Sequence, residues 1–575
     1  MSESLVLAET PDVFGAYPRL SDEQIEALAT VGERRSVEAG EVLYREGDGN
    51  AHLFVILDGL VAVVEESDSG ARAIGVHGRR RFLGDLGLVT GQTAFVTAVV
   101  REPGELLVLT ADLVRAIVTH DLVIGDLILR ALFMRRAILI GLGVGFRIIG
   151  SRYSPNTRRL RDFAVRNRLP HHWIDLESEP AAEDLLRRLS VPPEQTPVVL
   201  VGRDRVLRNP GNADLARALG LNSLPPRQAT WDLIVLGAGP AGLAAAVYGA
   251  SEGHDTLVLE AMATGGQAGL SSRIENYLGF PAGLVGADLA ERAAIQAQKF
   301  GAHITVSAEA SGLASDDGTL HVVLKDGDSI AGRAIVIATG VRYRRLPVKG
   351  LDRLEGVGVH YAATLAEAQQ CRGEPIVTVG GGNSAAQAAL LLAQYVPHLT
   401  LVLRERRLDE NMSRYLADRI EHTPAIEVLP HCEIREVVGN DSLEGLIVED
   451  SETGERRTVQ ARQLFVFIGA EPHTEWLRGR IALDSGGYVL TGSDAEAEVA
   501  AAGRPHAANG GDGQARLSLE TTMPGVFAVG DVRSGSVQRV AAAVGDGAIA
   551  IRLVHERLGG RLEAVRLAQS YVMVS

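Results

Sequence analysis

The chain has 575 residues, which at about 150 residues per domain predicts roughly four domains. Its 46% hydrophobic and 22% charged residues are typical of a globular protein and exclude wholesale disorder. A net charge of −15 without a basic run argues against a nucleic-acid partner. Having just two cysteines, Cys371 and Cys432, excludes a disulfide scaffold, a CxxC redox pair and a cysteine-based zinc cluster.

The sequence predicts neither a signal peptide nor a membrane-spanning helix. The first 20 residues lack a basic start followed by an apolar run. The most apolar region, residues 122–150, is interrupted by Arg130, Arg135 and Arg136. Its longest uncharged run, residues 137–146, is shorter than the about 20 residues needed to cross a bilayer. We therefore expect a cytoplasmic protein without membrane partners, and no residue spacing predicts a metal site.

Two modules are expected before residue 223. Residues 1–20 read as a loose leader, and a helix is expected over about 110–142. Between them, short strand-like runs predict a small barrel or roll, at 41–44, 52–56, 61–64, 73–76, 96–99 and 106–109. From 143 to 222, strand-like runs alternate with helix-like runs in an α/β pattern, with strands at 146–150, 172–177 and 198–202 and helices at 157–165 and 181–189.

Two strand–turn–helix units follow, each with a glycine-rich turn after an apolar strand. The first turn carries Gly237, Gly239 and Gly242, and the second carries Gly380 and Gly382 with an alanine in the third position. The first glycine permits the tight turn, the second lets the backbone approach a pyrophosphate, and the third position lets helix and strand pack closely. The spacing therefore predicts two Rossmann-like dinucleotide sites.

The polar residues at the end of the second strand of each unit indicate which nucleotide that unit binds. In the first unit this strand ends in Glu260, a carboxylate that can accept hydrogen bonds from both ribose hydroxyls. In the second unit the strand is followed by cations that suit a 2′-phosphate and favour NADP(H), namely Arg404, Arg406 and Arg407. Glu405 lies within this cluster and keeps NAD(H) as an alternative.

Six motifs together resemble the low-molecular-weight thioredoxin reductases over about residues 229–560: residues 237–242, 265–267, 274–276, 338–340, 380–385 and 525–531. The resemblance implies a homodimer and an FAD domain split into 229–344 and 473–560, with an NAD(P)H domain at 345–472 inserted and a C-terminal tail at 561–575. It implies FAD contacts at Gly237, Gly239, Gly242, Glu260, Gln267, Asn276 and Asp531, and Gln538 falls near the family's flavin-contacting pair.

The redox dithiol that the resemblance leads one to expect is missing. At its two positions stand Ala362 and Leu365, whose side chains form neither a thiolate nor a disulfide. Rescue by Cys371 and Cys432 requires their Cα atoms to approach within about 7 Å. The alternative is that Cys371 and Cys432 are two isolated thiols.

The two N-terminal modules also resemble known families. Residues 143–222 resemble a thioredoxin or glutaredoxin fold in which no thiol remains at the CxxC position, residues 154–157, and in which Pro197 precedes the edge strand. Residues 18–140, within a first domain of 1–142, resemble cyclic-nucleotide-binding domains. There Asp85 stands for the glutamate that binds the ribose hydroxyl, and Gln92 replaces the arginine that binds the cyclic phosphate. Losing that charge-assisted contact costs roughly 1.5–3 kcal/mol, which predicts a degenerate site.

The expected fold is therefore multidomain α/β, with two Rossmann-like domains preceded by a β-roll and a thioredoxin-like domain. The favoured function is an FAD-dependent NAD(P)H oxidoreductase that passes electrons from NADPH through FAD to an unknown acceptor without an internal dithiol. Flavin stacking by Tyr571 is a hypothesis drawn from related ferredoxin reductases. One alternative is a thioredoxin-disulfide reductase that uses partner or residual cysteines. Another is a flavin-based redox sensor or scaffold with a regulatory N-terminal domain.

Overall fold

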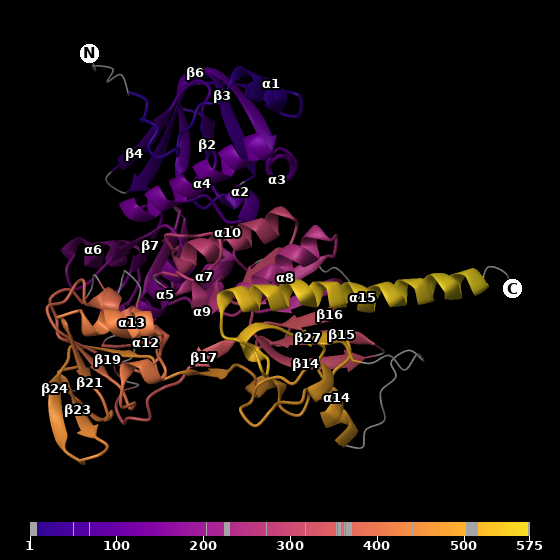
Figure 1. Cartoon of the computed structure of the whole chain (residues 1–575). Coiled ribbons are helices and arrows are strands. Elements are labelled where there is room, and N and C mark those ends of the chain that lie inside the picture. Colours follow the sequence, from indigo (N-terminus) through magenta and orange to yellow (C-terminus); the bar gives the residue numbers. More distant parts are fainter. Residues whose placement is uncertain are drawn as a thin grey trace.

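The computed structural model describes residues 8–49, 51–67, 70–202, 204–222, 230–271, 273–316, 318–351, 354, 358–361, 363, 368, 371–439, 442–501 and 516–572, with backbone only for 67, 180–181 and 560–572. The N-terminal roll lies at one end of the molecule, the 345–472 domain lies at the lower left, and helix α15 (Val540–Val572) projects to the right (Figure 1). None of the described helices combines the length and apolar character needed to cross a membrane.

The N-terminal module is a β-roll. After α1 (Asp22–Ala29), its sheet has the order β1-β6-β3-β4, with β2 on β6 and β5 on β3. The bounds are β1 (Glu33–Val37), β2 (Val42–Tyr44), β3 (His52–Ser67), β4 (Gly70–His77), β5 (Phe82–Leu83), α2 (Gly87–Thr90) and β6 (Thr97–Thr110). The expected runs 52–56 and 61–64 are one strand, as are 96–99 and 106–109, because bulges around Gly59 bend the paired strands without a turn.

One other expectation for this module is wrong, and one is refined. The leader is not loose over its described part, because Ala16 and Leu20 are buried and the Thr10 N–H donates to the Val76 carbonyl oxygen at 3.0 Å. The helical stretch expected over about 110–142 is confirmed, and it consists of two helices, α3 (Ala111–His120) and α4 (Leu122–Leu142). Asp121 adopts extended backbone between them, and its carboxylate accepts the first N–H groups of α4.

The second module is a four-stranded sheet of order β10-β9-β7-β8 with helices packed against it. Its elements are β7 (Phe146–Ile149), α5 (Pro155–Arg166), β8 (His171–Ile174), α6 (Pro180–Arg188), β9 (Val198–Val201), β10 (Arg205–Arg208) and α7 (Asn212–Ala218). This is the α/β alternation expected from the sequence, and the Thr196–Pro197 peptide bond is cis. Membership of the thioredoxin fold stays a prediction.

The first glycine-rich turn belongs to a sheet of order β13-β12-β11-β16-β15-β14, with β27 on β16. Its elements are β11 (Trp231–Leu236), α8 (Pro240–Ser251), β12 (Thr256–Glu260), α9 (Gly266–Gly269), α10 (Gly286–Lys299), β13 (His303–Val306), β14 (Ala310–Asp316), β15 (Thr319–Leu324), β16 (Ser329–Ile337) and β27 (Val526–Ala528). The parallel pairing of β27 with β16 means that the C-terminal segment completes the sheet begun by β11.

The second glycine-rich turn belongs to a parallel sheet of order β18-β25-β19-β20-β21, joined by an antiparallel sheet β22-β23-β24. The elements are β18 (Val359–His360), β19 (Ile376–Val379), α12 (Asn383–Leu392), β20 (Leu399–Val402), α13 (Arg414–Glu421), β21 (Ile426–Leu429), β22 (Cys432–Val438), β23 (Gly445–Asp450), β24 (Arg456–Gln460) and β25 (Gln463–Val466). The pair β17 (Val341–Tyr343) and β26 (Ala470–Pro472) connects the two domains.

The C-terminal expectations need correction. The Ala-, Gly- and Asp-rich composition of residues 493–513 predicts a mobile surface insertion, but its described part, residues 493–501, belongs to the helix α14 (Gly492–Ala501). The proposed tail at 561–575 is not a separate segment up to residue 572, because α15 continues through it as one helix. The backbone of Tyr571 is in that helix, and its side chain lies outside the described part of the structure.

The buried imidazole of His77 predicts acid sensitivity of the roll. Burial, with Arg135 and Arg81 adding to it, lowers the pKa of His77 to about 3, whereas the unfolded chain has about 6.5. The unfolded state therefore binds the proton first, and the free energy of unfolding falls as pH drops from 6.5 toward 3. We expect His77→Phe, which keeps a ring against Tyr17, to remove about 2 kcal/mol of the loss between pH 7.5 and pH 5.

Urea unfolding of the full chain at both pH values measures this difference. Other titrating groups contribute equally to the wild type and the variant and cancel in the comparison. Equal losses in the two proteins would contradict the assignment.

Candidate functional site

The two glycine-rich turns open into one cleft of about 1010 Å³ between the two Rossmann-like domains. The sequence placed these turns 143 residues apart, counting from Gly237 to Gly380. Nine of the predicted residues line this cleft: Gly237, Gly239, Glu260, Gln267, Gly380, Gly382, Arg404, Asp531 and Gln538. A single cleft that contains both turns is the arrangement that transfer between two bound nucleotides requires.

The first turn has no room for a side chain at Gly237 or at Gly242. Gly237 has φ 101°, and a Cβ there would lie 2.5 Å from the Ala338 carbonyl oxygen. A Cβ on Gly242 would lie 1.9 Å from the Gly237 carbonyl oxygen. This close contact holds the start of α8 against β11, and Gly239 provides no side-chain cap there. The residues therefore fit a pyrophosphate bound by the N-terminal N–H groups of α8.

Glu260 is fixed at the end of β12 by backbone donors. Its Oε2 accepts the Ala238 N–H at 2.7 Å, and its Oε1 accepts the Met262 N–H at 2.9 Å. Burial raises the pKa of Glu260, while these donors oppose the shift. The carboxylate is thus oriented at the wall of the cleft, where the predicted ribose contact requires it.

The remaining predicted flavin contacts do not all lie at the cleft. The Gln267 side-chain amide donates to the Val341 carbonyl oxygen at 2.6 Å and connects α9 to β17 at the cleft. Asp531 lies at the cleft after β27, where burial and Asp546 raise its pKa. Asn276 is exposed and does not line the cleft. The structure therefore brings Gln267 and Asp531 to the site but not Asn276.

The second turn is built like the first but ends in a different polar group. In the sheet register Val379 pairs with Val402, so Leu403 occupies the place that Glu260 has in the first unit. A Cβ on Gly381 would lie 2.3 Å from Oε2 of Glu405, so this carboxylate lies against the turn itself. Asn411 donates to its Oε1 at 3.0 Å. The side chain at the nucleotide turn is therefore an acid.

The structure removes two of the three predicted 2′-phosphate cations from the cleft. Arg406 donates to Glu452 at 3.0 Å, and Arg407 forms an ion pair with Asp409. Both are exposed and neither lines the cleft, whereas Arg404 does. The prediction that Arg406 and Arg407 face the 2′-phosphate is corrected, because their closeness to Arg404 in the sequence does not reveal these carboxylate partners.

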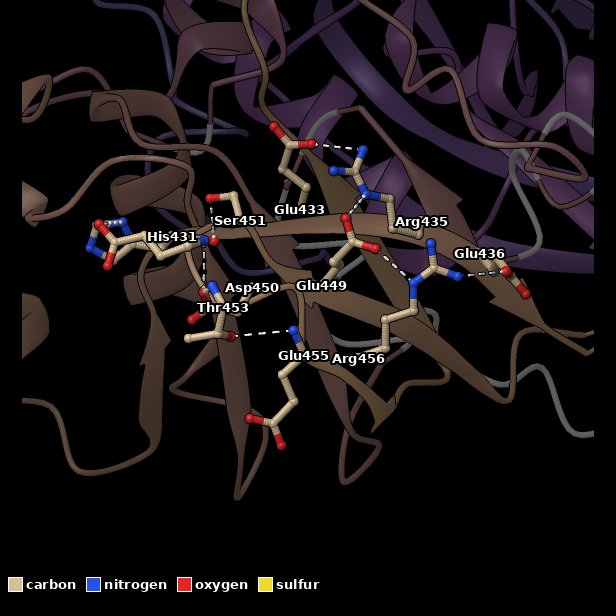
Figure 2. Close-up of polar contacts among 11 residues, drawn as sticks. His431, Glu433, Arg435, Glu436, Glu449, Asp450, Ser451, Thr453, Glu455 and Arg456 are labelled. Carbon is tan, nitrogen blue, oxygen red and sulfur yellow. Dashed lines mark hydrogen bonds and ion pairs between the residues drawn. The ribbon is translucent and has the colours of Figure 1, made fainter.

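The start of β22 forms a wall of the cleft that the sequence reasoning missed. Cys432, Glu433, Ile434 and Arg435 line it. Arg435 forms ion pairs at 2.9 Å with Glu433 and with Glu449, which also binds Arg456 (Figure 2). The hydrogen bond from Arg456, followed by that from Arg435, lowers the pKa of Glu449. The sequence signal is that the charged Glu433 and Arg435 alternate with the apolar Cys432 and Ile434, as expected for a strand with one exposed face.

The two cysteines lie in different cores. Cys371 is 1% exposed among the side chains around α12, and Cys432 is 6% exposed in the core beside β22. Neither is in a disulfide. Burial and Asp450 raise the pKa of Cys432, the opposite of an activated thiolate. The predicted dithiol positions Ala362 and Leu365 lie outside the described residues.

The cyclic-nucleotide site of the roll, which the sequence predicts to be degenerate, does contain a positive charge. Gln92 is buried, and Arg136 of α4 donates to its side-chain oxygen at 2.9 Å. Asp85 is buried nearby, where burial raises its pKa and Arg136 opposes the shift. The sequence placed no cation here because the arginine comes from a helix 44 residues further along the chain.

The structure also brings together three possible metal ligands that the sequence spacing did not indicate. Ligand atoms of Glu252, His254 and His555 lie within 4.8 Å of one another, at the junction of α8 and α15. None of the three lines the cleft. The group is therefore separate from the candidate active site.

Comparison with known families agrees with this geometry. The family described as pyridine nucleotide-disulphide oxidoreductase matches residues 231–547. The cyclic nucleotide-binding domain matches residues 34–121. The two modules therefore correspond to known families, as the motifs indicated.

Individual relatives match the same region. The chain is 33% identical over 332 residues to the 34.2 kDa protein in the rubredoxin operon of Clostridium pasteurianum, covering 57% of this chain and 98% of that protein. It is 32% identical over 320 residues to thioredoxin reductase of Treponema pallidum, covering 56% and 94%. The crystal structure of Lactococcus lactis thioredoxin reductase in its FR conformation matches with a TM-score of 0.51 at 26% identity, covering 58% and 100%. The two-Rossmann fold of this region is thereby confirmed.

The close contacts predict that a substitution at the first turn affects flavin binding, whereas one at the second turn affects binding of the nicotinamide nucleotide. We expect Gly242→Ala to yield protein without bound flavin, because the new Cβ would displace the turn that holds the pyrophosphate. A Cβ on Gly380 would lie 2.2 Å from the Phe467 carbonyl oxygen, so Gly380→Ala is expected to keep the flavin but raise the KM for nicotinamide nucleotide about tenfold or more. The visible spectrum and steady-state kinetics measure the two effects.

Gly559→Ala is the matched control, since a Cβ there meets no atom within 4 Å. It is expected to retain both flavin and kinetics. Full flavin content in Gly242→Ala would refute the assigned role of that turn.

Proposed function

Because this chain belongs to the pyridine nucleotide-disulphide oxidoreductase family and is an FAD-dependent oxidoreductase of the thioredoxin reductase-like type, we propose that it passes electrons from NAD(P)H through FAD to an external acceptor without an internal dithiol. The observation that carries this proposal is the state of its two cysteines. They stand 61 residues apart in the sequence, and both are buried in separate cores.

The residues of the cleft supply binding and orientation. The turn at Gly237 and Gly242 fits the pyrophosphate of FAD, and Glu260 fits its ribose. The turn at Gly380 fits the nicotinamide nucleotide. The bound flavin supplies the chemistry, accepting a hydride and releasing electrons to an acceptor.

The residual thiols are poorly suited to replace the missing pair. A disulfide requires Cβ atoms about 3.5–4.5 Å apart, and the side chains of Cys371 and Cys432 belong to different hydrophobic clusters. The raised pKa of Cys432 also lowers its thiolate fraction at neutral pH. A direct route from the flavin to the acceptor therefore fits the chain better than a thiol relay.

The names of the relatives favour a second candidate, reduction of a disulfide on a partner protein. Treponema pallidum and Mycolicibacterium smegmatis thioredoxin reductases are 32% and 31% identical to this chain. In that case the flavin would have to act directly on the partner's disulfide or through Cys432, which lines the cleft. A homodimer, implied by the same resemblance, is part of both proposals.

One experiment separates the two candidates. The purified full-length protein is reduced anaerobically with NADPH and with NADH, and then offered ferricyanide, a quinone, oxygen and a disulfide in turn. We expect turnover with ferricyanide and none with thioredoxin or a small aromatic disulfide. Disulfide turnover that is lost in Cys432→Ser or Cys371→Ser would overturn the dithiol-free proposal, and light scattering of the same sample gives the oligomeric state.

We further infer that the choice of nicotinamide nucleotide depends on two neighbouring charges. Arg404 is the predicted cation that lines the cleft, and it favours a 2′-phosphate. The Glu405 carboxylate against Gly381 favours a ribose hydroxyl and repels a phosphate. The chain is therefore expected to accept both NADPH and NADH.

Removal of the acid should shift this balance. We expect Glu405→Gln to raise the kcat/KM ratio of NADPH to NADH about tenfold, because a close like-charge contact costs about 1–2 kcal/mol. Arg404→Ala should lower the same ratio. Arg407→Ala is the control, since its guanidinium is already paired with Asp409 outside the cleft. An unchanged ratio in Glu405→Gln would show that this carboxylate does not face the nucleotide.

A further inference from the structure

A second hollow of about 910 Å³ lies where the roll, the second module and the flavin domain meet. Its lining comes mainly from α4 with the neighbouring α2–Gln92 segment, the stretch from Asp162 to His171, and α10 with the 260–271 segment. Residues of β13 and β17, with Leu221 and Leu391, complete it. Apolar side chains such as Ile140, Ala294 and Ile295 predominate. A hollow of this size and composition is typical of a site for a small organic molecule.

Arg136 is a buried charged side chain of this lining whose hydrogen-bond donors are only partly satisfied. It is 2% exposed and lines the hollow, and its Nη1 donates to Gln92 at 2.9 Å. Its Nε and Nη2 are buried and have no hydrogen-bond partner. A buried cation with two unsatisfied donors is unfavourable, so a ligand that accepts from both atoms would gain affinity from them.

The other arginines of the lining already have partners. Arg168 forms ion pairs with Asp288 at 2.7 Å and Glu291 at 2.8 Å, and Arg166 pairs with Asp162 at 2.8 Å. Arg342, also in the lining, pairs with Glu471 and Glu475. Arg136 has no ion pair within 4.0 Å among the described residues, although Asp85 and Glu291 act on it at longer range.

We propose that this hollow is a binding site for an organic carboxylate with an apolar body, whose carboxylate pairs with Nε and Nη2 of Arg136 once the side chains that cover these two buried atoms shift. These two nitrogens form the side of the guanidinium that binds a carboxylate through two parallel hydrogen bonds. The apolar lining next to it receives the body of the ligand. Nothing in this inference depends on how electrons leave the flavin.

The hollow shares Gln92 and Arg136 with the nucleotide site predicted in the roll, but no residue of strands β1–β6 lines it. It adjoins the flavin side of the cleft instead. Glu260, Gly266 and Gln267 line both hollows. A bound carboxylate would therefore contact the segment that connects the N-terminal modules to the flavin domain.

Calorimetric titration of the flavin-loaded full-length protein with decanoate tests the proposal. We expect one decanoate per chain, with decanamide, which has the same apolar body but no charge, binding at least tenfold more weakly. Arg136→Met should weaken decanoate binding by about 10- to 150-fold through loss of the charge-assisted hydrogen bonds. Arg166→Met, which removes a cation already paired in the same lining, is the matched control and should leave binding unchanged.

Melting curves show whether the variant is folded. Arg136→Met removes a buried charge that has no ion pair within 4.0 Å among the described residues, but also its hydrogen bond to Gln92, so a small change of the melting temperature in either direction is expected. Arg136→Lys, which keeps the charge without the two-nitrogen geometry, provides a second variant expected to bind more weakly. Equal affinities for decanoate and decanamide, or equal decanoate affinities in wild type and a folded Arg136 variant, would overturn the proposal. Cyclic AMP that displaces decanoate and binds more tightly would overturn the assigned ligand class.

Discussion

Close backbone approach at two glycine-rich turns is the constraint on which the catalytic half of this molecule depends. At the first turn, a Cβ on Gly242 would lie 1.9 Å from the Gly237 carbonyl oxygen, and at the second, a Cβ on Gly380 would lie 2.2 Å from that of Phe467. Each contact holds a helix N-terminus over the carboxyl end of a parallel strand. Because β17 and β26 connect the two sheets, the turns open into the same cleft.

Electrostatics then makes the two halves of this cleft different. The first turn is followed by Glu260, which is oriented by backbone N–H groups. At the corresponding place the second has Leu403, and the polar contact comes from Glu405 two residues later. The same local fold thus places a fixed acid at the first turn and a pair of opposite charges, Arg404 and Glu405, at the second. This difference in the residue at the same register position is the physical basis for treating the two sites as unequal.

The sequence could predict those features that depend on local backbone requirements. The glycine turns, the terminal position of Glu260 and the α/β alternation of the second module all follow from spacing. Features set by long-range side-chain contacts could not be predicted in this way. The pairing of Arg406 with Glu452 and the bulges that merge two runs into β3 both depend on segments distant in sequence. Asn276 shows the reverse case, since its motif is present but its side chain lies away from the cleft.

Arg136 also shows why the N-terminal modules are not independent additions. The core of the roll continues into the second module and reaches Val306 of the flavin domain. Arg168 extends from the second module to Asp288 and Glu291 on α10, and the Thr119 hydroxyl donates to the Lys299 carbonyl oxygen at the end of the same helix. A packed core transmits displacement because it has few voids. Since α10 and the 260–271 segment line the hollow around Arg136, a change in its occupancy would act on the flavin domain through contacts that are already formed.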